Sequence, residues 1–357
     1  MSRAVLRSLF AVAVICASPF VHAAVFCVQN SAELESAFKA VIDSTEDVSV
    51  FLKVGTYTAS IPDGFYAFTR VGVSLTVEGG FTEFGFSGQD CVSQVRGTFD
   101  PQRTILDGLG TKMVLALNPL FDGIGNISVR YLTLQNGVPL EDYSPVSLGS
   151  RDNGWAGTLT VENVIVRNMN NAFYEPVMML SDVGKVIVRN SVIVDNSNDG
   201  PGVFLIQTDY AGTGPGVVFN NNTVVNNHDG RANTPGGLFL AGSADAQIGN
   251  NIFWSNTLAG LTLGGNGQYA LTHNDIGTLS GTPASNVASF AVAPNFVSSS
   301  EGDYRLEHAS PLIDVGTNTV PGGHGSHDAQ GYARVIGATV DVGAMEWRDG
   351  IFADGFD

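Results

Sequence analysis

The sequence is poor in positive charge and in charge of any kind. Only 14% of the 357 residues are charged, and 17 Lys and Arg face 34 Asp and Glu, which gives a net charge of −17 at pH 7. A surface this acidic repels nucleic acid and anionic lipid, so neither is an expected partner. The sequence also lacks a run of about 18 apolar residues, so no membrane span is expected. Hydrophobic residues still make up 44% of the chain, enough for a large core.

Cysteine is scarce as well, with three residues in the whole chain. Cys16 lies in a segment typical of a secretory signal peptide, in which two Arg precede an apolar stretch and a small-residue cleavage motif ends at Ala23. Removal of residues 1–23 would place the protein outside the cell, at the outer cell surface or in the periplasm. The remaining pair, Cys27 and Cys91, would meet an oxidising compartment, where a disulfide is the default and two free thiols are the alternative.

Helical patterns are almost absent. One helix is predicted to begin at Ser31 as N-cap, because Leu34, Phe38, Val41 and Ile42 then fall on one face. A one-sided helix must cover an apolar surface. The rest of the chain consists of strands of about four residues, separated by Asn, Asp and Gly.

A repeated phrase is what the sequence has in abundance: two short apolar runs, each followed by Asn or Ser. Three clear copies span residues 186–196, 217–227 and 246–256, and two weaker copies end at Asn168 and Asn136. The copies recur at intervals of roughly 30 residues that vary by a few positions, which is typical of a solenoid whose loops differ in length.

Stacking the copies as parallel coils about 4.8 Å apart places equivalent residues over one another. The alignment predicts an inward Asn column that hydrogen-bonds from coil to coil, and an inward Val/Trp column two positions earlier. The position between these columns faces outward and allows an Arg167–Asp195 ion pair. The predicted Asn column is Asn136, Asn168, Asn196, Asn227 and Asn256, and the Val/Trp column is Val166, Val194, Val225 and Trp254.

Together these patterns predict an all-β, single-domain right-handed parallel β-helix with an N-terminal capping α-helix and a C-terminal cap. A β-propeller is disfavoured, because the hairpin turns of its blades are missing. The predicted division is residues 1–23 as signal peptide, 24–115 as cap helix and first coils, 116–290 as Asn-ladder coils, 291–347 as terminal coils and cap, and 348–357 as an acidic tail.

Three separated regions carry a resemblance to a known family: residues 26–34 with the Gly-rich turns up to 108, the Asn-rich coils, and the closing phrases at 294–316 and 340–346. The sequence resembles secreted bacterial right-handed parallel β-helix proteins of the choice-of-anchor Q type, within the pectate-lyase-like superfamily. The resemblance implies the fold but no activity, because this class includes lyases, hydrolases, adhesins and proteins without known activity. Its catalytic signatures are not matched, since Gly323-His324-Gly325 lacks the acidic and basic partners.

The strongest local cluster of candidate site residues follows the corner after Asn227. It contains His228, Asp229 and Arg231, and the corresponding loop of the preceding coil contains Asp199. Arg can pair with a uronate carboxylate, His or Arg can act as a base in β-elimination, and Asp199 with Asp229 could hold Ca²⁺. The alternative is that these residues make turns and a surface ion pair. No other cofactor is expected.

Two further sets of residues have a functional and a structural interpretation. A charged set near the C-terminus is either a metal or sugar site, or a group of Asx turns held together by a buried Arg. An aromatic set either stacks on sugar rings or packs under the loops. The charged set is Asp314, Asp328, Arg334, Asp341 and Glu346, and the aromatic set is Trp155, Phe173, Tyr174 and Tyr210.

Three functions remain open. Non-catalytic binding of carbohydrate or cell-envelope material is favoured, because no acid–base set is matched and the acidic surface disfavours anionic polymers. A polysaccharide lyase or glycoside hydrolase acting on a uronate polymer is the first alternative, and it requires a groove where carboxylates meet Arg151, Arg167, Arg189 or Arg231. A structural or adhesive surface protein is the second. The sequence determines neither the ligand nor the oligomeric state.

Overall fold

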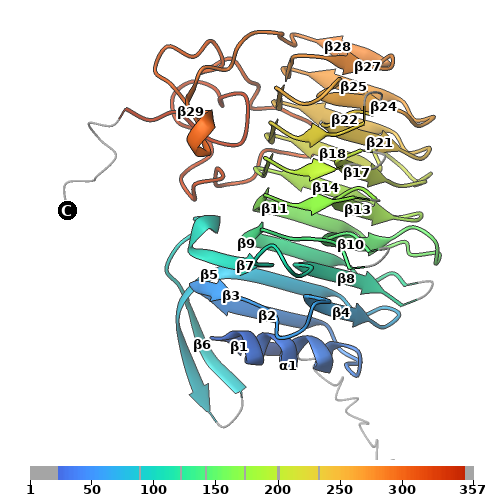
Figure 1. Cartoon of the computed structure of the whole chain (residues 1–357), viewed down its shortest axis with the longest axis vertical. Coiled ribbons are helices and arrows are strands. Elements are labelled where there is room, and N and C mark those ends of the chain that lie inside the picture. Colours follow the sequence, from blue (N-terminus) through green and yellow to red (C-terminus); the bar gives the residue numbers. More distant parts are fainter. Residues whose placement is uncertain are drawn as a thin grey trace, which may run out of the picture.

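The computed structural model describes residues 23–87, 90–120, 123–140, 143–172, 174–198, 202–231 and 234–349. Within them the chain forms a stack of coils whose strands pair in parallel from coil to coil, a right-handed parallel β-helix (Figure 1). The fold class predicted from the repeated phrase is therefore confirmed. Nearly all of the predicted signal peptide and of the acidic tail lies outside the described residues.

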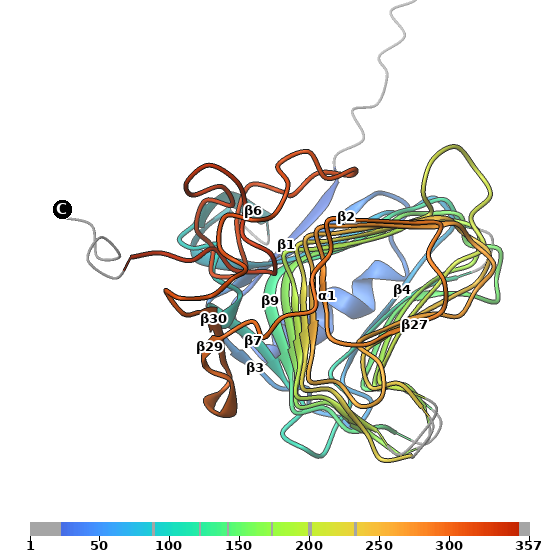
Figure 2. The ribbon, with the colours of Figure 1, turned by 90° about the horizontal axis from the view of Figure 1, so that it is seen from above.

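Four sheets build the molecule. A 17-stranded sheet bends around two sides of the coil, and an 8-stranded sheet forms another side (Figure 2). The 17-stranded sheet contains β1 (Ala24–Val28), β2 (Val48–Lys53), β3 (Gly55–Tyr57), β5 (Leu75–Ser87), β6 (Asp90–Arg96), β7 (Thr104–Asp107), β9 (Ile127–Gln135), β11 (Leu159–Arg167), β14 (Val186–Arg189), β15 (Val192–Val194), β18 (Val217–Asn220), β19 (Thr223–Val225), β22 (Ala246–Gly249), β23 (Ile252–Trp254), β25 (Tyr269–Thr272), β26 (Asp275–Ile276) and β28 (Ser285–Val287). The 8-stranded sheet contains β4 (Phe65–Thr69), β8 (Leu115–Pro119), β10 (Val146–Ser150), β13 (Val177–Ser181), β17 (Phe204–Gln207), β21 (Leu238–Ala241), β24 (Leu261–Leu263) and β27 (Leu279–Ser280).

Two small sheets complete the fold. A 3-stranded sheet at one corner contains β12 (Asn170–Asn171), β16 (Ser197–Asn198) and β20 (His228–Asp229), and a 2-stranded antiparallel sheet contains β29 (Phe296–Ser298) and β30 (Asp303–Leu306). Two 3₁₀ turns, η1 (Pro101–Arg103) and η2 (Ser299–Glu301), connect strands.

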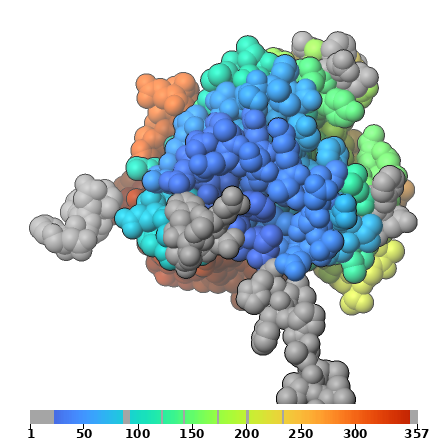
Figure 3. Space-filling view, turned by 90° about the horizontal axis from the view of Figure 1, so that it is seen from below, coloured from blue at the N-terminus to red at the C-terminus, as the bar shows by residue number. Residues whose placement is uncertain are grey.

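The predicted helix is α1 (Ser31–Val41), and it closes the N-terminal end of the stack. Its N-cap is Asn30, one residue before the predicted Ser31, and the Asn30 side chain accepts from Glu33 N at 3.0 Å. Leu34 and Phe38 are buried among the residues of the first coil. Figure 3 shows that N-terminal residues (blue) cover this end of the molecule.

The chain bends twice in each coil at residues with left-handed backbone. These residues form two columns, and every φ in them lies between +50° and +57°. Asn and Asp tolerate this conformation better than most other residues, which explains much of the Asn content of the repeat. The first column is Tyr131, Asn163, Asn190, Asn221, Asn250 and His273, and the second is Asn136, Asn168, Asp195, Asn226 and Ser255.

The observed register corrects the predicted alignment of two copies. Arg167 pairs with Val194, so Asn168 corresponds to Asp195, and Met169 corresponds to Asn196, whose Oδ1 accepts from Met169 N at 3.0 Å. Asn136 and Asn168 therefore belong to the second bend column, not to the inward Asn column. The prediction was one residue out, because matching Asn168 to Asn196 places the copies 28 residues apart, whereas β11 pairs with both β14 and β15 at an interval of 27.

Two buried Asn ladders run through the stack. The predicted column Asn196, Asn227 and Asn256 is confirmed as the first, with side-chain contacts of 2.9 and 3.0 Å between successive members. The second ladder, Asn222, Asn251 and Asn274, lies after the first bend and has contacts of 3.1 and 2.8 Å. Each amide also bonds to a backbone group of a neighbouring coil, so these interior amides are satisfied.

The C-terminal segment, residues 290–349, lies along the flank of the coils, whereas we predicted that residues 291–347 would close the last coil (Figure 2). We call it the cover. Its apolar side chains, among them Tyr304 and Leu312, pack on an outward-facing apolar cluster that includes Val194 and Val225. Val194 and Val225 were predicted to face inward, but the cover shields them on the outside. This outer cluster is separate from the main core within the coil.

One part of the cover, residues 317–328, runs down the stack as a strap. Outward Asn side chains hold it through its backbone carbonyls: Asn250 donates to Thr317 O at 2.9 Å, and Asn220 donates to Pro321 O at 2.8 Å. Asn190 donates to His324 O at 2.7 Å. The Asn residues of the repeat thus serve three purposes, as ladder members, as bend residues and as donors to the strap.

Candidate functional site

The corner that contains His228 is built by the 3-stranded sheet. Parallel pairing places Asn170, Ser197 and His228 in one column on the surface, and Asn170 Nδ2 lies 3.2 Å from Ser197 Oγ. His228 is exposed, and its Nδ1 lies 3.0 Å from Thr257 Oγ1 in the next coil. The loops after the Asn corner therefore present a flat column of neutral polar groups and one imidazole.

Asp229 lies on the opposite side of the same strand from His228 and is buried. Its Oδ1 accepts from Arg231 N at 2.7 Å, which is the turn geometry of the structural alternative. Its Oδ2 is buried without a hydrogen-bond partner among the described residues. Asp199, the predicted partner for Ca²⁺, lies outside the described residues. Across the described ranges, no three His, Cys, Asp or Glu side chains gather as a metal site.

A groove of about 590 Å³, here called the corner groove, lies next to this column. Phe239, Thr262 and Ser280 occupy one outward column of the 8-stranded sheet and form part of its lining. Leu258 follows the residue that bonds to His228, and its side chain is 52% exposed at the lip. The described residues that line the groove carry apolar carbons and hydroxyls, and none has a titratable side chain. They are Pro235, Phe239, Leu258, Ala259, Thr262, Thr278, Leu279 and Ser280.

Three of the four arginines proposed as a basic patch contact different partners. Arg151 lies beyond β10 in the 8-stranded sheet, beside Asp152. Arg167 donates to Gln135 Oε1 at 2.7 Å, and Arg189 donates to the strap carbonyl of Gly322 at 3.1 Å. The predicted Arg167–Asp195 ion pair is not among the contacts of these two described residues.

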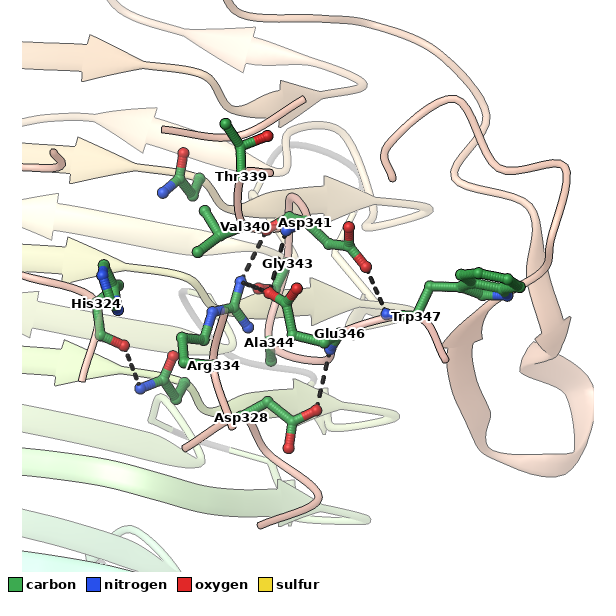
Figure 4. A network of polar contacts seen from close by, with 12 residues as sticks. His324, Asp328, Arg334, Thr339, Val340, Asp341, Gly343, Ala344, Glu346 and Trp347 are labelled. Atoms are coloured by element: carbon green, nitrogen blue, oxygen red, sulfur yellow. Dashed lines mark hydrogen bonds and ion pairs between the residues drawn. The ribbon is translucent and has the colours of Figure 1, made fainter. Parts of the chain in front are cut away.

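Arg334 lies at the centre of the C-terminal charged set and is 1% exposed. Its Nη2 lies 3.1 Å from Glu346 Oε1 and donates to the carbonyl oxygens of Asp341 at 2.7 Å and Gly343 at 2.9 Å (Figure 4). Asp328 accepts three backbone N–H groups from the same segment. These contacts support the structural interpretation, in which one buried guanidinium holds the turns of the cover together.

Burial dominates the electrostatics of this set. It raises the pKa of Glu346 to about 8, although the neighbouring Arg334 acts in the opposite direction. Burial also raises the pKa of Asp328 and of Asp341, and it lowers the pKa of Arg334. Asp314 contributes its backbone N–H to Asp341 Oδ1 at 2.7 Å, and its side chain is exposed. Shifted pKa values at this set therefore follow from its burial and do not by themselves indicate a site.

A column of alternating charge crosses the sheet just before the first bend. The alignment of the repeat copies from sequence did not reveal it. Glu78 pairs in register with Arg130, Arg130 with Glu162, and Glu162 with Arg189. Arg189 Nε lies 3.0 Å from Glu162 Oε1, and Arg130 Nε lies 3.6 Å from Glu162 Oε2. All four residues occupy the same place in their copies, so alignment on the first bend would have found them.

The aromatic set divides between packing and surface positions. Trp155 is fully buried, and its Nε1 donates to Gly125 O at 2.9 Å, so it packs inside. Tyr210 lies under the ammonium group of Lys185, 4.7 Å from the ring centroid. Tyr174 is exposed, and Phe173 lies outside the described residues. The three described rings do not line the corner groove, whose lining includes Phe239, an aromatic residue that the sequence did not single out.

The predicted disulfide would join β1 to β6. Cys27 lies in β1, and the side chain of Cys91 is outside the described residues, although β1 and β6 lie close to each other. The pairing of Cys27 with Cys91 stays a prediction. Among the residues that the structure describes, no helix is both long and apolar enough to span a membrane.

Comparison with known proteins adds little beyond the fold. No family model matches the chain, and no curated protein matches it. One solved structure found as similar is titled "Crystal structure of pectate lyase Pel9A", at 14% identity and a TM-score of 0.25, covering 87% of this chain and 91% of that chain. A likeness this weak carries no argument about activity, and the β-helix architecture rests on the strand register itself.

Proposed function

We propose that this chain is an exported β-helix protein that binds carbohydrate in the corner groove without cleaving it. The supporting observation is the groove's lining, in which a phenyl ring stands among hydroxyl groups. The face of Phe239 suits the apolar C–H face of a pyranose ring. Thr278 and Ser280 are exposed in the lining, and their hydroxyls can donate to and accept from sugar hydroxyls.

One further feature supports binding over turnover at this place. Glycoside hydrolysis and β-elimination need a group that moves a proton at the scissile bond, and the described lining of the corner groove supplies none.

The proposal also covers the cellular location and the family of the chain. Its N-terminal pattern supports export to the outer surface or periplasm, and the closing phrase around Arg334 supports a place among choice-of-anchor Q proteins. Ca²⁺ enters only as an accessory ion near Asp229, whose Oδ2 is unpartnered among the described residues. Carboxylate oxygens are the ligands that Ca²⁺ prefers, and binding should be measured with and without it.

The test is a panel of neutral and uronate oligosaccharides, titrated calorimetrically against the mature chain, with absorbance of unsaturated products followed in parallel. Neutral oligosaccharides should bind, and Phe239→Ala should weaken their binding about fivefold, since ring stacking contributes on the order of 1 kcal/mol. Tyr66→Ala is the matched control. Tyr66 occupies the same outward column at the far end of the sheet, so its loss should leave affinity unchanged.

Two results would overturn the proposal. Absence of binding across the panel, or binding that Phe239→Ala does not weaken, would exclude the corner groove as a carbohydrate site. Accumulation of unsaturated or reducing ends would establish the alternative, a lyase or hydrolase.

A further inference from the structure

A second pocket of about 350 Å³, the flank pocket, lies between the coils and the cover. Its floor is apolar and includes Ile165 and Val192. Polar groups from both sides converge on it: Arg167 and Asp195 from the second bend of two successive coils, and the turn η2 with Tyr304 from the cover. Segments more than a hundred residues apart in the sequence thus build one concave site.

The charged groups of the coil side are only partly engaged. Arg167 uses Nε and Nη2 to donate to the single oxygen Gln135 Oε1, at 3.0 and 2.7 Å, so Nη1 makes no hydrogen bond to the described residues. Asp195 Oδ2 accepts from the Tyr304 hydroxyl at 2.7 Å, while Oδ1 has no such partner within the described ranges. The donor Arg167 Nη1 and the acceptor Asp195 Oδ1, on adjacent coils, are therefore available to a ligand.

The balance of charge indicates the kind of ligand. Two carboxylates, those of Asp195 and Glu301, line the pocket against one guanidinium, that of Arg167. The remaining polar groups are neutral hydroxyls and amides, including those of Ser300 and Gln102. A lining with excess negative charge on a strongly acidic protein attracts a cation and repels a uronate.

We propose that the flank pocket binds a small hydroxylated cation of the amino-sugar class. The ammonium group lies between the carboxylates of Asp195 and Glu301, and the sugar hydroxyls contact Arg167 Nη1 and the hydroxyls of η2. The apolar floor takes the C–H face of the ring. This site shares no lining residue with the corner groove and stands independently of the function proposed there.

The probe is glucosamine, compared with N-acetylglucosamine and glucuronate by calorimetry on the mature chain at low salt. Glucosamine should bind at least tenfold more tightly than the neutral acetylated sugar, and glucuronate should not bind. Asp195→Asn and Glu301→Gln should each weaken glucosamine at least fivefold. Asp195→Asn keeps an acceptor for the Tyr304 hydroxyl, so an unchanged thermal midpoint would show that the variant is folded.

The matched control is Glu307→Gln, an exposed glutamate of the same cover segment that does not line the flank pocket, and it should bind like the unaltered chain. Phe239→Ala should also leave glucosamine binding unchanged, which separates this site from the corner groove. Tighter binding of glucuronate than of glucosamine, equal binding of all three sugars, absence of glucosamine binding, or folded Asp195 and Glu301 variants with full affinity would each overturn the assignment.

Discussion

Replacing Asn196 by Leu should remove about 3 kcal/mol from the free energy of unfolding, since one buried N–H would lose its partner and one buried C=O would lose a hydrogen bond. Asn196 is fully buried in the first ladder. Its Oδ1 accepts from Met169 N at 3.0 Å, and its Nδ2 donates to Val166 O at 3.2 Å and to Asn227 Oδ1 at 2.9 Å. Leu fills a similar volume but offers no polar atom to these groups.

The magnitude follows from counting the groups that would be orphaned. Met169 N–H would stay in the interior without its partner, at about 1–3 kcal/mol, and Val166 C=O, which also lies in the β11–β15 ladder, would lose one hydrogen bond, at about 1 kcal/mol. Asn227 Oδ1 would keep the backbone bond from Asn196 N, at 3.2 Å, so it adds little. A loss of about 3 kcal/mol is a large share of the roughly 5–15 kcal/mol by which folded proteins are stable.

The matched control is Asn168→Gly, because the local phrase suggests the same role for Asn168 and Asn196 whereas the structure separates them. Asn168 has φ +55°, a conformation that Gly adopts without strain, and its side chain is exposed. It would lose only a surface contact of 3.3 Å to Asn136. The expected change is below about 1 kcal/mol.

Urea unfolding followed by circular dichroism gives both values, with thermal midpoints at a fixed scan rate as the fallback if refolding is incomplete. Equal losses in the two variants would refute the register that places Asn168 in the bend column. An unaltered midpoint for Asn196→Leu would show that its side chain is not in the interior, and the ladder argument would fail.

Three other expectations concern the cover and the N-terminal end. Burial raises the pKa of Glu346 to about 8, above its usual value near 4.5, so the protonated form favours folding. Its contribution to the free energy of unfolding is complete below pH 4.5 and is lost as the pH rises to about 8. Glu346→Gln should flatten the pH dependence of the free energy of unfolding in urea titrations. An unaltered pH profile would show that Glu346 is ionised throughout. Asn220→Ala, which removes two hydrogen bonds to strap carbonyls, should speed limited proteolysis within the strap, whereas Asn168→Ala, at an exposed position, should not. Equal cleavage of the two variants would show that the Asn220 side chain does not hold the strap. Non-reducing peptide mapping should recover Cys27 linked to Cys91, and two alkylatable thiols at these positions in the natively folded protein would refute the pairing.

Much of the corner site was foreseeable, and much was not. The sequence directed attention to the loops after each Asn corner, and the exposed His228 column lies there. It passed over Phe239, because an aromatic residue in an apolar strand looks like core until alternation and register show which face it occupies. The flank pocket could not be predicted, since it joins Asp195 to Tyr304 across the cover.

The sequence by itself determined the architecture of this protein. Short apolar runs, Asn at the corners and a period near 30 residues leave few ways to bury apolar surface and satisfy amides other than a stack of parallel coils. The tertiary structure alone decided which Asn residues are ladder members, bend residues or donors to the strap. A shift of one residue in the alignment of two coils exchanges the inward and outward faces. It also decided that the last segment lies on the flank, since the apolar side chains that hold it there look in sequence like any other core.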